Sequence, residues 1–237
     1  KPLEEVMDYK DGIWGVRARN KEQMFALDLL MDPTIEVVSL VGKAGSGKTL
    51  MAIAAGLDQV LSNLNIKDKL KDDTYCRTPY KKLVVSRPVM PMGKDIGFLP
   101  GSLEEKMAPW LAPVQDNLKF LTGDDQTTLD DYMERGQIEI EALTYIRGRS
   151  IANAFIVIDE AQNLTAHEIK TILTRVGEGT KIVLTGDVEQ IDNIYINEMS
   201  SGLTHAVEKM KFNDITGHIT LKKGERSRVA TLAAKIL

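Results

Sequence analysis

Short apolar runs rich in β-branched residues recur along the whole chain. They occupy residues 35–42, 81–88, 137–143, 154–160, 180–187 and 218–223. Several are apolar without polar alternation, which is typical of strands buried on both faces of a parallel sheet. The runs therefore predict strands of one mainly parallel sheet.

Helical periodicity separates these runs. One apolar stripe consists of Leu50, Ile53, Ala54, Leu57 and Leu61, and another of Ile169, Ile172, Leu173 and Val176. Strands that alternate with helices form an open sheet covered on both faces, so the pattern predicts a three-layer α/β fold. We expect residues 1–237 to form a single domain, with a polar surface insertion at 63–82 and an irregular loop at 87–101.

Composition narrows the class of protein. The single cysteine, Cys76, excludes an internal disulfide and favours a reducing, cytoplasmic setting. The histidines are few and scattered, so no metal-ligand cluster is evident. No apolar run is long enough to cross a bilayer, and we expect no membrane partner. A net charge of −4 does not indicate nucleic-acid binding over the whole surface, although a local basic groove is compatible with it.

A glycine-rich motif, GKAGSGKT, lies directly after an apolar run and directly before a helical stripe. In that context glycines let backbone N–H groups surround phosphate oxygens, and the helix N-terminus adds its positive dipole. We expect ATP here, with Lys48 at the β- and γ-phosphates and Thr49 at Mg²⁺. The alternative is a simple turn with an exposed lysine. The predicted nucleotide-binding residues of this loop are Gly42, Lys43, Ala44, Gly45, Ser46, Gly47, Lys48 and Thr49.

A second motif, FIVIDEAQN, ends a buried strand with two carboxylates. Asp159 lies where ligands bind in open α/β sheets, and it is predicted to hold Mg²⁺ through water. Glu160 is predicted to orient or deprotonate the attacking water, which favours hydrolysis over transfer to a substrate hydroxyl. The alternative, a solvated strand end, is less favoured once the glycine-rich loop is present.

Two further polar stretches complete the predicted site. In VLTGDVEQID, Asp187 and Gln190 are candidates to sense the γ-phosphate, against the alternative of a turn with a capping aspartate. Upstream, Gln23 begins a helix ahead of the phosphate loop. Its amide is a candidate partner for adenine, against the alternative of an ordinary surface residue.

These motifs together carry a family likeness. GKAGSGKT, YIRGRSIANAFIVIDEAQN, LTGDVEQID and the specific run R-P-x-x-x-x-G-x-x-x-G-F-L-P-G resemble a PhoH-type ATPase over the chain from about Trp14 onward. That family is similar to the first RecA-like domain of superfamily 1 helicases. The resemblance implies a RecA-like P-loop fold that hydrolyses ATP with Mg²⁺ to unwind or remodel RNA. It also implies that Lys48, Thr49, Asp159, Glu160 and Gln190 have the roles given above.

The opening GIWGVRARNKEQMFALDLL is most similar to the subgroup in which a PIN nuclease precedes the ATPase. The resemblance implies that residues 1–16 are a linker from such a domain and that ATP hydrolysis is coupled to RNA cleavage in the full protein. This chain carries no PIN-type acidic cluster, so we expect no nuclease activity from it alone.

Superfamily 1 helicases complete their site with an arginine from a second RecA-like domain, and this chain has room for one such domain. The arginine is therefore expected in trans, from a head-to-tail neighbour in a closed ring, and the family likeness points to a hexamer. Arg226 is the leading candidate, with Arg228 beside it; their alternative is a pair of solvated helix-start charges. Arg147 and Arg149 are rivals that we assign more readily to RNA phosphates.

Single-stranded RNA requires cationic and stacking groups. The candidates are Arg87, Lys94, Phe98, Tyr145, Arg147 and Arg149. The alternatives are that Phe98 fills the domain interior and that the arginines pair with carboxylates. Two functional readings stay open: an RNA-acting motor, and a module in which ATP drives oligomerisation and regulates an attached nuclease. A small-molecule kinase is disfavoured, since no acceptor pocket is evident.

Overall fold

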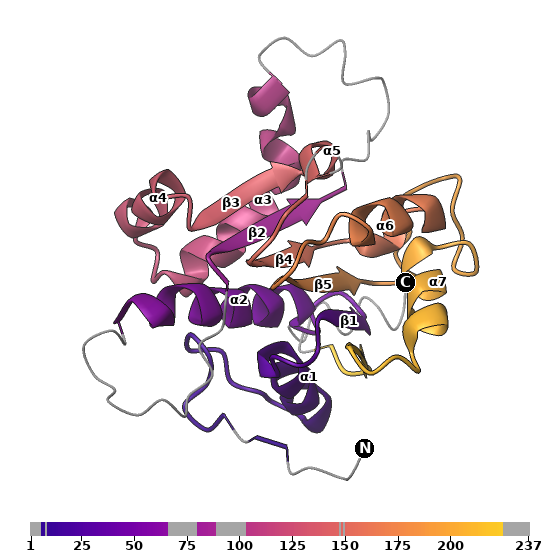
Figure 1. The fold of residues 1–237 in the computed structure, drawn as a ribbon, viewed down its shortest axis with the longest axis horizontal. Coiled ribbons are helices and arrows are strands. Elements are labelled where there is room, and N and C mark those ends of the chain that lie inside the picture. The colour runs from indigo at the N-terminus through magenta and orange to yellow at the C-terminus, as the bar shows by residue number, and fades with distance from the viewer. Residues whose placement is uncertain are drawn as a thin grey trace, which may run out of the picture.

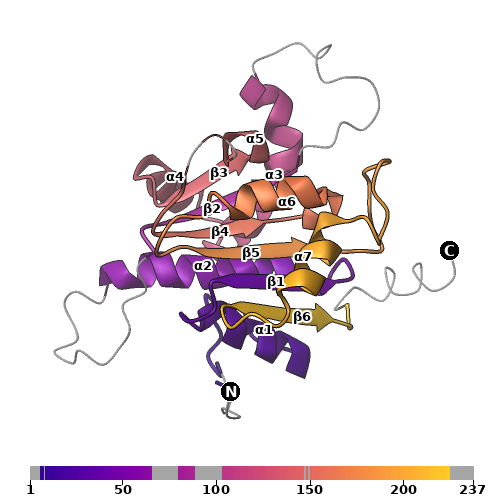
Figure 2. The ribbon, with the colours of Figure 1, turned by 45° about the vertical axis from the view of Figure 1, so that its right-hand side comes forward.

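Six parallel strands form one central sheet in the computed structural model, which describes residues 6–7, 9–65, 80–88, 103–146, 148 and 150–224. The strand order is β3-β2-β4-β5-β1-β6, and every neighbouring pair is parallel. Figures 1 and 2 show the sheet between its two helical layers. The strands are β1 (Val37–Gly42), β2 (Lys82–Arg87), β3 (Ile138–Ala142), β4 (Ala154–Ile158), β5 (Lys181–Gly186) and β6 (Thr216–Leu221). All the predicted strands are confirmed, and so is the α/β fold class.

Helices cover both faces of the sheet, as the alternating pattern predicts (Figure 2). One face is covered by α1 (Lys21–Met31), α2 (Lys48–Asn65), α3 (Leu103–Leu121) and α4 (Gln126–Glu134). The other is covered by α5 (Leu143–Ile146), α6 (Ala166–Leu173) and α7 (Gly202–Met210), with the short 3₁₀ turn η2 (Ala161–Asn163) after β4. No helix in the described part of the chain is both long and apolar enough to cross a membrane.

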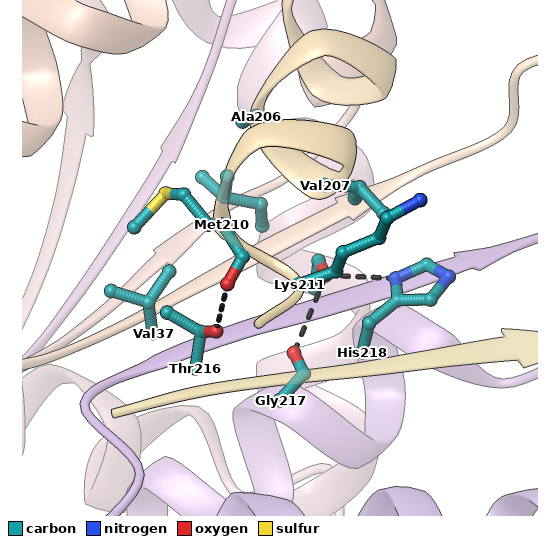
Figure 3. A pocket seen from close by; sticks show the side chains of 10 residues that line it. Val37, Ala206, Val207, Met210, Lys211, Thr216, Gly217 and His218 are labelled. Atoms are coloured by element: carbon teal, nitrogen blue, oxygen red, sulfur yellow. Dashed lines mark hydrogen bonds between the residues drawn. The ribbon is translucent and has the colours of Figure 1, made fainter. Parts of the chain in front are cut away.

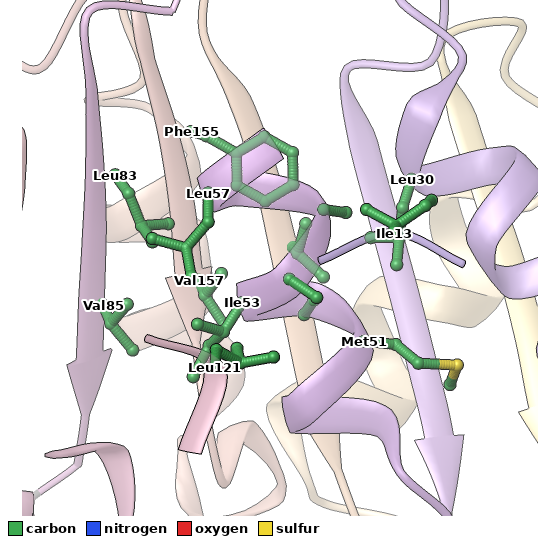
Figure 4. Packing of buried hydrophobic residues seen from close by; sticks show 14 of the residues in the cluster. Ile13, Leu30, Met51, Ile53, Leu57, Leu83, Val85, Leu121, Phe155 and Val157 are labelled. Carbon is green, nitrogen blue, oxygen red and sulfur yellow. The ribbon is translucent and has the colours of Figure 1, made fainter. Parts of the chain in front are cut away.

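The central strands are apolar throughout because both of their faces are buried. In β4, Phe155 and Val157 point to the α2 side, whereas Ile156 packs under α6 and α7. Figure 4 shows Phe155 between α2 and β2 in this core. Helix α2 crosses so closely that a Cβ on Gly56 would lie 2.6 Å from Leu83 Cδ1. The glycine therefore sets the distance between the central helix and the sheet.

A buried lysine fixes the end of α1 to the sheet. Lys181, at the start of β5, is fully buried, and its Nζ donates to the carbonyl oxygens of Leu29, Leu30 and Asp32 at 3.1, 2.8 and 2.7 Å. These are carbonyls that a helix C-terminus leaves without intrahelical partners. Burial lowers the pKa of Lys181 to about 7, although Asp32 opposes this shift.

Two expected segment boundaries shift. Residues 63–65 form the last turn of α2. Tyr80 is buried, with its ring centroid 5.6 Å from that of Phe155. The insertion expected at 63–82 is therefore shorter and covers 66–79, which lies outside the described residues. The linker expected at residues 1–16 is also shorter than predicted. Ile13 is buried in the α2-side core and bridges to Val16, so this part of residues 1–16 packs on the domain.

Candidate nucleotide-binding site

Three loops converge at the carboxyl edge of the sheet. They follow β1, β4 and β5, and these strands are adjacent in the order β4-β5-β1. Ligands of open α/β sheets bind at this edge because the loops leave parallel strands in the same direction. This arrangement brings together the site residues that were predicted from the motifs at 42–49, 159–163 and 187–190.

The loop at 42–49 has the backbone geometry of a phosphate cradle. Gly45 and Gly47 have φ angles of 79° and 84°, which favour glycine. A Cβ on Gly42 would lie 2.6 Å from the Leu221 carbonyl oxygen, so the neighbouring strand leaves no room for a side chain. The Oγ of Ser46 is buried and has no hydrogen-bond partner in the structure. The loop thus offers unsatisfied polar atoms to an anion.

Lys48 and Thr49 form the start of α2 directly after this loop. Lys48 is buried at 7% exposure, yet within the described part of the chain its Nζ has only a long contact, 3.5 Å, with the Lys43 carbonyl oxygen. A buried ammonium at a helix N-terminus strongly favours an anionic partner. The alternative reading of an exposed lysine on a simple turn is wrong, and the residues present fit a triphosphate.

Asp159 joins the loops after β1, β4 and β5. Its Oδ1 accepts hydrogen bonds from Thr49 Oγ1 at 2.7 Å and from Thr185 Oγ1 at 2.6 Å. Thr49 and Asp159, each predicted to hold Mg²⁺, thus lie within hydrogen-bond distance of each other. Thr185 was not predicted, because a threonine inside a strand carries no distinctive signal. Hydroxyl and carboxylate oxygens suit Mg²⁺, which takes few protein ligands and completes its shell with water and phosphate. Among the described residues no group of three or more His, Cys, Asp or Glu forms a denser metal site.

Glu160 begins the η2 turn in the left-handed region, with φ 53°. Both of its carboxylate oxygens are engaged: Oε1 contacts Arg87 Nη2 at 3.3 Å, and Oε2 accepts from Gln162 Nε2 at 2.6 Å. Of the arginines proposed to contact RNA, Arg87 therefore pairs with a carboxylate. The pair is half-buried, with side-chain exposures of 23% and 29%.

Gln162 connects the loop after β4 to the loop after β5. It is fully buried; its Oε1 accepts from the Asp187 backbone N–H at 3.1 Å, and its Nε2 also donates to the Gln190 carbonyl oxygen at 2.8 Å. This residue was not nominated from the sequence. The sequence indicated Gln162 only through its place in the DEAQN motif, next to the predicted site residues Asp159 and Glu160.

Asp187 reaches the phosphate loop. Its Oδ2 accepts from the Ala44 backbone N–H at 2.8 Å, and its Oδ1 accepts from the Glu189 N–H at 3.1 Å. Lys43 and Glu189 add an exposed ion pair at 2.9 Å between the same two loops. The nominated Gln190 lies in this loop with an exposed side chain, and its backbone N–H donates to Asp187.

Gln23 lies beneath the phosphate loop. Its Nε2 donates to the Ser46 carbonyl oxygen at 3.0 Å and its Oε1 accepts from the Arg19 N–H at 2.7 Å, with 5% exposure. The alternative of an ordinary surface residue is therefore wrong. In this arrangement Gln23 holds the loop, and a contact with adenine would require its amide to exchange partners.

Several nominated side chains lie outside the described residues. They are Lys94, Phe98, Arg147, Arg149, Arg226 and Arg228, whereas the backbone of Tyr145 belongs to helix α5. The described strand β6 ends at the same edge of the sheet as the phosphate loop, with Leu221 beside Gly42. Lys222 and Lys223 follow it and are exposed.

A small pocket lies at the other edge of the sheet, between the end of α7 and the first residues of β1 and β6 (Figure 3). Ser39 Oγ lies 2.8 Å from His218 Nδ1 and donates to the Gly217 carbonyl oxygen at 3.3 Å. Burial lowers the pKa of His218, although Glu208 opposes this shift. None of the nominated site residues lines this pocket, so it is separate from the converging loops.

Comparison with known proteins assigns the chain to a family. The family model described as PhoH-like protein matches residues 15–237. The chain is 54% identical to Protein PhoH2 of Bacillus subtilis, over 99% of this chain and 50% of that protein. It is 41% identical to Protein PhoH2 of Mycolicibacterium smegmatis, over 95% of this chain and 48% of that protein. The chain thus spans about half the length of these curated relatives.

A solved structure, the Pif1 helicase from Candida albicans, matches with a TM-score of 0.41 and 16% identity, over 93% of this chain and 43% of that one. This likeness is too distant to carry an argument about function. The family match and the phosphate loop are sufficient for the assignment: the chain belongs to the PhoH-like protein family and forms a P-loop NTPase domain.

Proposed function

We propose that this domain binds ATP with Mg²⁺, hydrolyses it, and uses the cycle to unwind or remodel RNA, which it binds as a single strand. The observation that carries the proposal is the convergence of Lys48, Thr49, Asp159 and Glu160 at one edge of the sheet. These residues supply a buried cation, a pair of metal-binding oxygens and a carboxylate from two segments that are about 110 residues apart in the chain. A purely structural turn requires none of them.

The phosphates would be held by the backbone N–H groups of the loop, the α2 N-terminus and the Lys48 ammonium. Thr49 and Asp159 are the residues that would hold Mg²⁺, which neutralises phosphate charge and orients the transferred group when bound. Thr185 holds the Asp159 carboxylate through the same Oδ1 that Thr49 contacts. Glu160 would orient the attacking water and accept its proton, and Gln190 would report the state of the γ-phosphate.

The nucleic-acid part of the proposal rests on the family, on Arg87 at the end of β2, and on Arg147 and Arg149, which precede β4 in the sequence. RNA is the proposed partner, with a PIN nuclease domain preceding this one in the full protein. We further propose a hexameric ring in which Arg226 of a neighbouring copy completes the transition-state charge stabilisation. The second candidate function is a regulatory module in which ATP binding drives assembly. It is favoured by the hydrogen bond from the phosphate loop to Asp187 and by the ion pair between Lys43 and Glu189. These contacts connect the nucleotide-binding loop to an exposed segment after β5.

ATP turnover, measured with and without single-stranded RNA over a series of protein concentrations, distinguishes these functions. The motor predicts stimulation by RNA and cooperative dependence on protein concentration. The regulatory module predicts slow turnover indifferent to RNA, together with ATP-dependent assembly. Turnover indifferent to both RNA and protein concentration would reject the arginine in trans.

A further inference from the structure

The carboxylate proposed as the catalytic base is occupied by protein donors. Arg87 Nη2 engages Glu160 Oε1 at 3.3 Å and Gln162 Nε2 engages Oε2 at 2.6 Å. An attacking water needs one of these oxygens as its acceptor. Each oxygen has a second lone pair, so the contacts do not exclude a water, but the Arg87 guanidinium places a cation against the oxygen that would take up the water's proton. Release of that contact would make the carboxylate a better proton acceptor, so the observed arrangement is a resting one.

The Gln162 contact is the more firmly held of the two. Gln162 is fully buried, and its amide also bonds the Asp187 N–H and the Gln190 carbonyl oxygen. Opening this contact would disturb buried hydrogen bonds, which is costly. The Arg87 contact is longer, joins one nitrogen to one oxygen, and lies between half-exposed side chains. Such ion pairs contribute little and exchange easily.

The backbone places Arg87 where an external ligand can reach it. Arg87 ends β2, and the Asp159 N–H donates to the Ser86 carbonyl oxygen at 2.8 Å, which sets the guanidinium beside Glu160. In the strand order β2-β4-β5-β1, Arg87 reaches Glu160 from the β2 side, whereas the phosphate loop lies on the β1 side. Lys48 and the loop amides are the groups placed to meet the nucleotide phosphates, so the guanidinium of Arg87 is available to an anion that arrives from the β2 side.

We propose that Arg87 is a positioning residue that couples RNA binding to hydrolysis. A backbone phosphate of single-stranded RNA at the carboxyl edge draws the guanidinium away from Glu160 and frees its Oε1 for the attacking water. A phosphate accepts a charge-assisted, bidentate pair from arginine, which is stronger than the single contact it replaces. This inference rests on the proposed function, since it names how RNA would regulate the same site.

Substitution of Arg87 tests the coupling. In Arg87→Gln, ATP turnover without RNA should rise about two- to five-fold, the range expected when a half-exposed ion pair is removed. The ratio of RNA-stimulated to RNA-free turnover should fall towards one. Arg87→Lys retains a cation without the bidentate geometry and should keep part of the stimulation. Arg135→Gln, which removes an exposed arginine paired to Asp131 on α4, should leave both values unchanged.

A binding readout separates this role from a structural one. The salt dependence of affinity for a single-stranded oligouridylate should lose about one phosphate contact in Arg87→Gln, while ATP affinity stays at the wild-type value. Equal loss of turnover with and without RNA, or an unchanged stimulation ratio, would overturn the inference. If the wild-type chain is not stimulated by RNA, the proposed function itself fails, and that result is read from the wild type alone.

Discussion

The carboxylate of Asp187 accepts a hydrogen bond from the backbone of the phosphate loop: the Ala44 N–H donates to Asp187 Oδ2 at 2.8 Å. Asp187 is 4% exposed, and its own backbone N–H donates a second hydrogen bond to Gln162 Oε1. The loop after β5 is therefore attached to the phosphate loop through an anion. A nucleotide would bring further negative charge to the same place.

Neutralising this carboxylate should tighten ATP binding. In Asp187→Asn the side chain keeps an acceptor but loses its charge, and removal of the repulsion should lower Kd by about five-fold, roughly 1 kcal/mol for partly screened charges. Glu189→Gln is the matched control, because it removes a 62% exposed carboxylate from the same segment and should have little effect. Fluorescence titration with an ATP analogue measures both. Weaker binding by Asp187→Asn would show that the carboxylate braces the loop rather than competing with phosphate.

Truncation of Gln162 should affect both stability and turnover. Gln162→Ala leaves the buried Asp187 N–H without this partner, which costs about 1–3 kcal/mol, and it also removes the donor to the part-buried Gln190 carbonyl oxygen. Urea unfolding measures that loss. Because Gln162 is also the donor that keeps the Glu160 carboxylate oriented when Arg87 is released, kcat should fall while ATP affinity changes less. Unfolding at the wild-type midpoint would contradict the assignment of Gln162 as a buried connector.

The buried ammonium of Lys181 predicts a pH dependence of stability. Its pKa is about 7 in the folded protein, against 10.5 for a solvated lysine, so the unfolded chain binds more protons between these values. The contribution of this group to the free energy of unfolding therefore rises with pH from about 7 to 10.5, by up to roughly 5 kcal/mol.

Denaturant unfolding across that pH range checks this contribution. The difference between wild type and Lys181→Met isolates it, since other titrating groups are common to both proteins. Lys181→Met should also be destabilised at high pH, where the carbonyl oxygens at the end of α1 lose their donor. A difference that stays constant with pH would contradict the lowered pKa.

Gly56→Ala should destabilise the domain although alanine is the better helix former. The new methyl group would lie 2.6 Å from Leu83 Cδ1 and 2.9 Å from Phe155 Cδ1, in a fully buried contact between α2 and the sheet. Overpacking of this kind typically costs about 1–3 kcal/mol. A higher melting temperature, as helix propensity alone predicts, would mean that α2 lies farther from the sheet than the structure places it.

The strands and the phosphate loop could be predicted from sequence because each has a local cause. An apolar run buried on both faces, and glycines that precede a helix, leave their pattern within a few residues. The contacts of Thr185 and Gln162 could not be predicted in this way. They depend on which strands are neighbours and in what register, and threonine and glutamine are ordinary residues until the sheet places them beside Asp159 and Glu160.

Arg87 and Lys181 illustrate the same limit for charged residues. A basic residue at the end of an apolar run is usually solvated. From the sequence alone, the partner of Arg87 could be either an RNA phosphate or a carboxylate. The parallel pairing of β2 with β4 decides in favour of Glu160 in this structure. Lys181 is buried because α1 ends over β5, a contact between segments that the chain separates by about 150 residues.

The central claim is that Lys48 binds the nucleotide and that Glu160 acts in its hydrolysis. Paired measurement of Mg-ATP affinity and turnover in Glu160→Gln tests it most directly. We expect Glu160→Gln to bind ATP with close to wild-type affinity and to lose turnover by at least about 100-fold, as for removal of a general base. Lys48→Ala should lose ATP binding as well as turnover. Near wild-type turnover by folded Glu160→Gln would contradict the assignment of this carboxylate and the site built around it.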